Sequence, residues 1–168
     1  MPCRTAAWID ATLRFMLDAV VPSSAAFDGD TTGMNFDAIS TAWAPRLLSV
    51  LRIMTGLMFL QHGTQKILGF PPSGRAAPEL LSLSGVAGMF ELVGGVLIVL
   101  GLFTRPVAFI LSGQMAVAYF LAHASRGFYP ILNGGELAVL YCFTFLYLAA
   151  AGPGPWSLDA QMRTRRYA

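Results

Sequence analysis

The sequence predicts an all-α membrane protein in which four apolar helices form a transmembrane bundle. Hydrophobic residues make up 55% of the 168-residue chain and charged residues only 12%, roughly half the charge of an ordinary soluble domain. Four apolar runs lack the alternation typical of strands, and each is followed by glycine or proline. This composition excludes a soluble enzyme, a disordered chain and a nucleic-acid binder, and it makes the lipid bilayer the expected surrounding.

Residues 1–45 precede the apolar runs and form an N-terminal extension. Thr5–Val21 predicts a short amphipathic helix, because Asp10, Arg14 and Asp18 recur every four residues on one stripe. Pro22 to Gly33 is predicted to be a loop. The extension lacks the uninterrupted apolar core of a secretory signal. In the alternative interpretation, translation starts at Met34 and the extension is not part of the natural protein.

A four-helix transmembrane domain is predicted over residues 46–152, followed by a basic tail over residues 153–168. The expected spans are Leu47–Leu68, Leu83–Phe103, Val107–Ala124 and Gly135–Ala151. The first is long enough, at about 1.5 Å per residue, to cross a hydrocarbon core of about 30 Å.

Basic residues near the spans predict the orientation of the chain. One side carries more of them (Arg46, Arg105, Arg163, Arg165 and Arg166) than the other (Lys66, Arg75 and Arg126). The richer side is expected to be cytoplasmic, which places both termini inside the cell. Trp43 and Trp156 then lie at the cytoplasmic interface, where tryptophan is enriched.

Ionisable residues within the spans form the candidate site. A charge at the centre of a bilayer costs about 2.5–3.5 kcal/mol, so such residues need a partner or a function. Six of them are predicted to meet in the outer half of the bundle: His62, Lys66, Glu91, His123, Arg126 and Glu136. Glycines share their helical stripes, which lets backbones approach closely: Gly56 and Gly63 on one helix, Gly88 and Gly95 on the next. Arg52 lies nearer the cytoplasmic face, and its side chain is expected to extend to that interface.

The chain also contains a short internal similarity. Phe59–His62 is similar to Phe120–His123, a basic residue follows each, and the next helix supplies a glutamate. This pattern predicts two parallel two-helix repeats. Because the match is short, chance similarity remains the alternative.

Several motifs in a fixed order carry a family resemblance: His62-Gly63-x-Gln65-Lys66, Glu91-x-x-Gly94-Gly95, Gly101-Leu102-x-Thr104-Arg105, Gly134-Gly135-Glu136 and Gly152-Pro153-Gly154-x-Trp156-Ser157-Leu158-Asp159. Over about Arg46 to Asp159 the chain resembles the DoxX family of bacterial inner-membrane proteins. The resemblance implies four transmembrane helices and a link to quinone-coupled sulfur oxidation or to membrane complexes that handle oxidative or thiol stress. Residues 1–45 lie outside it.

The first functional hypothesis is a quinone-linked or redox-stress-associated membrane subunit. A neutral histidine or a lysine can donate to a quinone carbonyl, and a nearby carboxylate can pass protons. Tyr119, Tyr141 and Tyr147 suit a ring-binding pocket, although packing is the ordinary role of a tyrosine. The chain has no haem-attachment, flavin or dinucleotide motif. The chain would therefore need an electron-carrying protein partner or would use the quinone itself, and it could serve as a subunit of a membrane oxidoreductase complex.

Three alternatives compete with the quinone hypothesis. In a scaffold protein, Glu91 pairs with Lys66, and Glu136 pairs with Arg126 or His123, as structural salt bridges. In a small transporter, the cluster forms an outer vestibule. Histidine and glutamate could also bind zinc or iron, but nearby Lys66 and Arg126 would repel a cation, so no metal site is predicted. Oligomerisation remains open.

Overall fold

The computed structural model describes residues 36–72, 74 and 78–166. The predicted helix Thr5–Val21, the predicted loop after it, the start at Met34 and the basic residue Arg75 all lie outside this part. The helices that carry the site belong to the second of two compact units, Asp37–Ala168.

Within the described residues, the fold is helical and has no strand. The long helices are α2 (Phe36–Leu68), α3 (Leu83–Leu100), α4 (Thr104–Ala118) and α6 (Glu136–Ala151). A π-helix (Tyr119–His123) and a 3₁₀ turn (Ala124–Arg126) continue α4, and two short helices complete the fold, α5 (Pro130–Asn133) and α7 (Leu158–Arg166).

Three helical segments are long and apolar enough to cross a membrane: Ile39–Leu68, Leu83–Leu100 and Thr104–Arg126. The predicted fourth span corresponds to α6, which is apolar but has only 16 residues, about 24 Å of helix. It begins at Glu136, close to the predicted start, and follows Gly134, whose left-handed conformation (φ 70°) ends α5. The prediction of an all-α membrane protein is therefore confirmed, with three long apolar helices and one shorter one.

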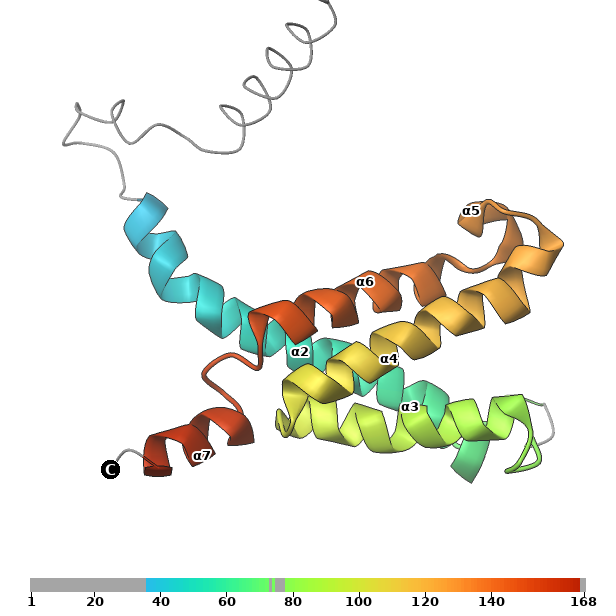
Figure 1. The fold of residues 1–168 in the computed structure, drawn as a ribbon, viewed down its shortest axis with the longest axis horizontal. Helices are drawn as coiled ribbons and strands as arrows, with labels where there is room; N and C mark the ends of the chain where they lie inside the picture. Colours follow the sequence, from blue (N-terminus) through green and yellow to red (C-terminus); the bar gives the residue numbers. More distant parts are fainter. Residues whose placement is uncertain (1–35, 73, 75–77, 167–168) are drawn as a thin grey trace, which may run out of the picture. The chain divides into compact units, whose positions relative to one another are not determined.

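Two helix boundaries differ from the sequence prediction. The helix α2 begins at Phe36, well before Leu47, and contains Pro45; it bends in this first part (Figure 1), as helices do around a proline. The segment Thr104-Arg105-Pro106, expected to separate two helices, is the first turn of α4. Proline is tolerated there because the first amides of a helix have no partner within it. The break falls instead at Gly101, whose left-handed conformation caps α3.

Glycines bring α2 and α3 into close contact. A Cβ on Gly63 would lie 2.7 Å from the Leu92 Cα, and one on Gly95 would lie 2.9 Å from the Leu60 Cα. A Cβ on Gly56 would lie 3.0 Å from the Val99 amide nitrogen. Only glycine fits at such backbone crossings. The predicted glycine stripes thus form the interface between these two helices.

The helices α4 and α6 lie side by side (Figure 1). Aromatic residues join α6 to α2. Phe59 packs edge-on against Tyr141 and Phe145, with ring centroids 5.2 and 4.8 Å apart. Together with aliphatic neighbours they form the buried core: Ile98, Ala108, Leu111, Met115 and Leu148.

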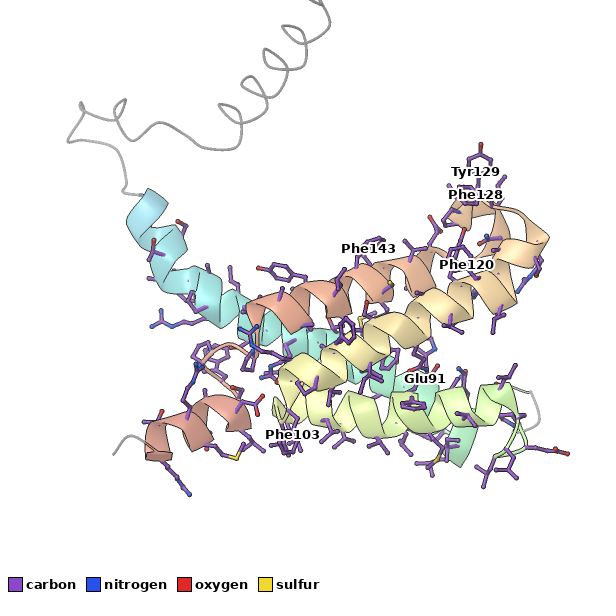
Figure 2. All side chains as sticks on the ribbon, viewed as in Figure 1. Glu91, Phe103, Phe120, Phe128, Tyr129 and Phe143 are labelled. Atoms are coloured by element: carbon purple, nitrogen blue, oxygen red, sulfur yellow. The ribbon has the colours of Figure 1, made fainter. Side chains whose placement is uncertain are left out.

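The outer faces of the helices are apolar. Large hydrophobic side chains remain exposed along α3, α4 and α6, among them Val93, Phe109, Ile110, Leu140 and Phe143. In Figure 2, Phe143 projects from the outer face of α6, while Glu91 lies among the helices. Such a distribution suits hydrocarbon as the surrounding solvent.

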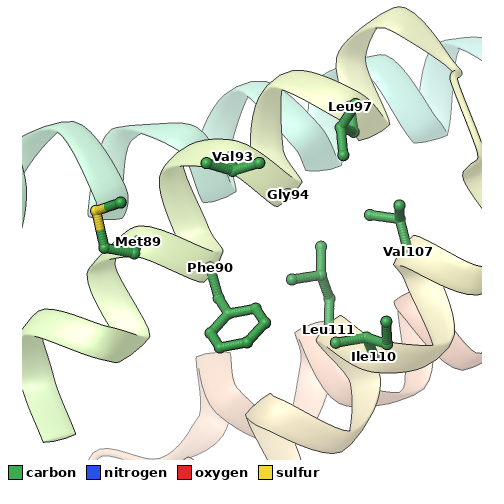
Figure 3. A pocket seen from close by; sticks show the side chains of 8 residues that line it. All are labelled: Met89, Phe90, Val93, Gly94, Leu97, Val107, Ile110 and Leu111. Atoms are coloured by element: carbon green, nitrogen blue, oxygen red, sulfur yellow. The ribbon is translucent and has the colours of Figure 1, made fainter.

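An apolar groove of about 330 Å³ runs between α3 and α4. Its lining side chains include Phe90, Val93, Ile110 and Leu111, and Gly94 opens its floor (Figure 3). A Cβ on Gly94 would lie 2.7 Å from a Leu111 methyl group, so the glycine is needed for this approach.

The two ends of the helices are named here by an ionisable residue of α2 near each, Arg52 and Lys66. At the Arg52 end, α3 and α6 finish and α4 and α7 begin; at the Lys66 end, α2 and α4 finish and α3 and α6 begin. Figure 1 shows α4 and α6 diverging from α3 toward the Lys66 end.

Candidate functional site

An ion pair between α2 and α3 is the centre of the candidate site. The Lys66 Nζ lies 2.6 Å from the Glu91 Oε1. The Glu91 side chain is 4% exposed and that of Lys66 is 32% exposed, so the carboxylate is buried and the ammonium reaches the surface. The close glycine crossing holds the two helices in the register that brings these residues together.

The second oxygen of Glu91 has no hydrogen-bond partner among the described residues. Three other buried polar atoms in the described residues share this property: the Thr104 hydroxyl at the start of α4, the Gln114 Oε1 farther along α4 and the Tyr141 hydroxyl on α6. The Gln114 Nε2 donates to the Ala87 carbonyl at 3.2 Å, one helical turn from Glu91 on α3. Glu91 also lies within electrostatic range of the Tyr141 phenol. Buried polar atoms usually have hydrogen-bond partners. The unpartnered oxygens of Glu91, Gln114 and Tyr141, on three neighbouring helices, therefore mark a candidate site.

His62 lies at the edge of this cluster. Its ring meets the Tyr141 ring edge-on with centroids 6.0 Å apart, but its side chain is exposed. It precedes Lys66 by one helical turn on α2. The histidine therefore stands between the buried cluster and the outer surface of the helices.

His123 lies in the π-helix at the end of α4, and its contacts are with that end of the chain. Its Nδ1 is 3.2 Å from the Asn133 carbonyl, and its ring stacks on Tyr119 at 6.5 Å. The Tyr119 hydroxyl donates to the Phe128 carbonyl. The buried Asn133 side chain donates to the Gly127 carbonyl at 2.6 Å. These bonds fix the loop between α4 and α6.

Arg126 and Glu136 are both exposed. Arg126 donates from Nη2 to the Ala122 carbonyl at 2.9 Å, within its own helical segment. Glu136 lies in the first turn of α6, where the helix dipole favours a carboxylate. Within the described part of the chain, Lys66–Glu91 is the one side-chain ion pair, and neither His123 nor Arg126 pairs with Glu136.

The six predicted site residues thus fall into two groups. Lys66 and Glu91 are bonded, with His62 close by. His123, Arg126 and Glu136 lie where α4 ends and α6 begins, on the helices that diverge from α3 in Figure 1.

A second polar cluster surrounds Arg52, which is fully buried. Its Nε donates to the Pro153 carbonyl at 2.8 Å. Its Nη1 donates to the Ile98 and Val99 carbonyls, the latter at 2.7 Å, and its Nη2 donates to the Trp156 carbonyl. The prediction that this side chain extends to the interface is wrong, because four carbonyls at the end of α3 and in the loop after α6 bind it.

Asp159, at the start of α7, completes this cluster. Its two carboxylate oxygens accept the amides of Phe103 and Thr104, each at 2.9 Å. Its own amide donates to the Gly101 carbonyl at 2.9 Å. The carboxylate thereby caps the start of α4. Phe103, the residue just before this helix, takes a left-handed conformation (φ 49°). The motifs around Gly101 and Trp156, distant in sequence, therefore belong to one hydrogen-bonded cluster.

Sequence reasoning missed Gln114 and gave Tyr141 only a general role. The signal for Gln114 is the presence of an uncharged amide in the otherwise apolar stretch of α4, which is costly in hydrocarbon without a partner. The part of the chain described here contains no group of three His, Cys, Asp or Glu side chains placed to hold a metal ion.

The fold and the buried ionisable pair define this chain as a multi-pass helical membrane protein. The DoxX family profile matches residues 47–124. A protein of Haemophilus influenzae without an assigned function is 51% identical over 126 residues, which cover 70% of this chain and 91% of that protein. Inner membrane protein YphA of Escherichia coli is 32% identical over 130 residues, 68% of this chain and 89% of YphA. The chain belongs to the DoxX family and, like YphA, is a membrane protein.

A more distant relative has a name that refers to a reaction. "Putative oxidoreductase CatD" of Bacillus subtilis is 28% identical over 115 residues, 66% of this chain and 82% of that protein. No solved structure matches this chain significantly.

Proposed function

We propose that this chain is a quinone-binding membrane subunit of a redox complex in the bacterial inner membrane, with the cluster around Glu91 as the ring site. The observation that supports this most directly is the buried Glu91 carboxylate, which has one oxygen on Lys66 and the other without a partner. The names of two relatives, one an inner membrane protein and the other a putative oxidoreductase, favour the same class.

The residues of the cluster fit both forms of a quinone. The Lys66 ammonium and the Tyr141 hydroxyl are donors for a quinone carbonyl, and the Glu91 Oε2 and Gln114 Oε1 are acceptors for a quinol hydroxyl. A bound quinone supplies two-electron chemistry, in which quinone plus two electrons and two protons gives quinol. Glu91 would hold and pass the protons, and a redox protein partner would exchange the electrons.

The groove between α3 and α4 suits the isoprenoid tail of such a molecule. It is lined by apolar side chains (Figure 3). Phe90 and Gly94, which line it, flank Glu91 on the same two turns of α3. An amphiphile with a polar ring and an apolar chain therefore matches two adjacent features of one helix.

The ring site is tested by thermal unfolding of the purified protein with and without decylubiquinone. The analogue is expected to raise the melting temperature of the native chain. Tyr141→Phe is the sharpest variant, because it removes a hydroxyl without a partner: stability stays unchanged or rises slightly, while the quinone-induced shift falls. Glu91→Gln is expected to abolish the shift, and Glu79→Gln, the same change in an exposed loop residue, to leave it intact. A native protein that does not respond to the analogue would contradict the proposal.

The tail site is tested with Ile110→Trp, which fills the groove. Binding of decylubiquinone is expected to weaken, whereas binding of the tailless 2,3-dimethoxy-5-methylbenzoquinone stays unchanged. Phe143→Trp, on the outer face of α6, is the matched control for a tryptophan facing lipid. Equal effects of the two substitutions would exclude the groove.

A scaffold protein is the second candidate, because the Lys66–Glu91 pair it requires is present. In that function, Lys66→Met or Glu91→Gln lowers stability by leaving an uncompensated charge. The double variant Lys66→Met/Glu91→Gln then restores the stability of the protein and, with it, its scaffold function in cells. In the quinone function the double variant recovers stability but not the response to decylubiquinone.

We also propose the finer architecture: a four-helix bundle of two parallel two-helix repeats with both termini in the cytoplasm. Arg46, Arg105, Arg163 and Arg165 gather toward the Arg52 end, which supports a cytoplasmic position for it. The alternating directions of α2, α3, α4 and α6 agree with two parallel repeats. A fluorescent-protein fusion to the C-terminus is expected to fluoresce, and a periplasmic alkaline phosphatase fusion at the same point to be inactive.

A further inference from the structure

A pocket of about 680 Å³ lies at the Arg52 end, remote from the Glu91 cluster. It is lined by residues from the early part of α2, the start of α4, the loop after α6, and α7. Its wall combines apolar side chains, such as Leu48 and Met162, with the charged side chains of Arg105, Asp159 and Arg163. The pocket is therefore amphipathic.

The negative charge in this pocket is already compensated. Both oxygens of Asp159 accept backbone amides at the start of α4, where the helix dipole also favours a carboxylate. Both oxygens are therefore bound to protein donors, which weakens the repulsion of an incoming anion.

The positive charges, by contrast, have spare donors. Arg105 donates through Nη1 to the Ala149 and Ala150 carbonyls, at 3.1 and 2.7 Å, and these bonds leave its Nε and Nη2 available. Arg163 is exposed and has no ion-pair partner in the described part of the chain. The Thr104 hydroxyl, in the same wall, is buried and has no hydrogen-bond partner among the residues that the structure describes. An arginine fork with free donors matches the oxygens of a phosphate group.

The surroundings place this pocket at the level of lipid headgroups. Trp43, with Arg46 stacked 5.4 Å over its ring, and the half-exposed Trp156 lie at the same end, and tryptophan favours the membrane–water interface. The short helix α7 carries both apolar and basic side chains: Leu158 and Met162 share one face, Arg165 lies about 20° around the helix from Leu158, and Arg163 lies about 100° from Met162. Helices of this kind lie in the interface plane.

We propose that this pocket binds the phosphate of an anionic phospholipid, held by Arg105 and Arg163 at the start of α4 and on α7. The apolar wall, with Leu48 and Met162, takes the first part of the acyl chains. The lipid joins α7 to the transmembrane helices. This inference is independent of the quinone proposal, because it uses none of the same residues.

The test is native mass spectrometry of the full chain taken from nanodiscs of equal parts phosphatidylglycerol and phosphatidylcholine. The native chain is expected to retain phosphatidylglycerol selectively. Arg163→Gln, which removes an exposed arginine without a partner, is expected to weaken that retention about fivefold. Arg46→Gln, at the same end but outside the pocket, is the matched control and is expected to have no effect.

Three outcomes would overturn the assignment. The first is equal retention of the two lipids by the native chain. The second is an equal loss in Arg163→Gln and Arg46→Gln, which would indicate general surface charge. The third is a rise in melting temperature with millimolar inorganic phosphate that is as large as that with phosphatidylglycerol, which would assign the pocket to a soluble phosphate. Arg163→Lys, which keeps the charge but loses the fork, is expected to fall between the native chain and Arg163→Gln.

Discussion

The two buried charged residues in the described part of the chain, Arg52 and Glu91, have opposite hydrogen-bonding environments. Arg52 donates from all three of its nitrogens to four backbone carbonyls. Glu91 has a single partner, Lys66, and one oxygen without any. Both residues lie on apolar helices, where an unsatisfied charge is costly.

This difference separates a structural site from a candidate functional one. A fully satisfied polar network rigidifies a fold, whereas a partly satisfied one carries a cost that needs an explanation. The Arg52 network joins the end of α3 to the loop that leads into α7. The Glu91 cluster, on four helices, retains unused donors and acceptors, which suits an exchangeable ligand or proton.

The largest expected effect comes from breaking the Arg52 network. Arg52→Ala removes a charged donor from four backbone carbonyls and is expected to cost about 3–5 kcal/mol of unfolding free energy, as for a broken buried charge network. Arg52→Lys keeps the charge but not the planar fork, and recovers only part of the loss. Thermal or denaturant unfolding in detergent measures both. Arg46→Ala, in an exposed arginine that stacks on Trp43, is the control; an equal change in the two alanine variants would contradict the structural role.

A somewhat smaller effect is expected from separating the helices that hold the Lys66–Glu91 pair. Gly63→Ala places a methyl group against the Leu92 backbone, and the forced movement is expected to cost about 1–3 kcal/mol. The control is Gly113→Ala, because a methyl group there meets nothing within 4 Å; it is expected to be neutral or to stabilise by up to about 1 kcal/mol. The unfolding free energies of Gly63→Ala and Gly113→Ala, measured under the same conditions, test this prediction. Equal stabilities would mean that α2 and α3 do not require this close contact.

Loss of the α4 cap ranks next. Asp159→Asn keeps one acceptor but removes the charge, and is expected to cost about 1 kcal/mol. Release of α7 should follow, so trypsin is expected to cleave at Arg163 and Arg165 sooner than in the native chain. A proteolysis rate that does not change would show that other contacts hold α7 in place.

The smallest effect is expected for Glu136→Gln. This variant tests whether Glu136 acts together with the Glu91 cluster. Because this side chain is exposed, Glu136→Gln is expected to change stability by no more than about 0.5 kcal/mol. If only the Lys66–Glu91 group binds quinone, the response to decylubiquinone also stays unchanged. A lost response would instead unite all six predicted residues in one function.

Much of the architecture follows directly from local sequence. The apolar runs locate the long helices, because a segment without polar side chains must satisfy its backbone internally in hydrocarbon. Helical spacing alone places Gly56 and Gly63 on the stripe of Lys66, and Gly88 and Gly95 on that of Glu91. The tight α2–α3 contact and the ion pair follow from this arrangement.

The remaining features depend on how the helices diverge. Sequence depth correctly places His123 and Glu136 at the Lys66 end, but depth does not specify which neighbours a residue meets. The π-helix turns His123 toward Asn133, and the separation of α4 from α3 takes this group away from Glu91. Local sequence patterns also do not predict the hydrogen-bond partners of Arg52, because these are backbone carbonyls in segments far along the chain.

By itself, the sequence determined that this chain is helical, apolar and membrane-embedded, and it placed glycines on the stripes of two helices that do approach closely. These properties depend on composition and on the fixed 100° step of a helix, both of which are local. Only the tertiary structure decided that Arg52 binds four carbonyls and that Glu91 keeps a free oxygen beside Gln114 and Tyr141. The physical reason is that hydrogen bonding of a buried group depends on which atoms surround it, and those atoms come from helices distant in sequence.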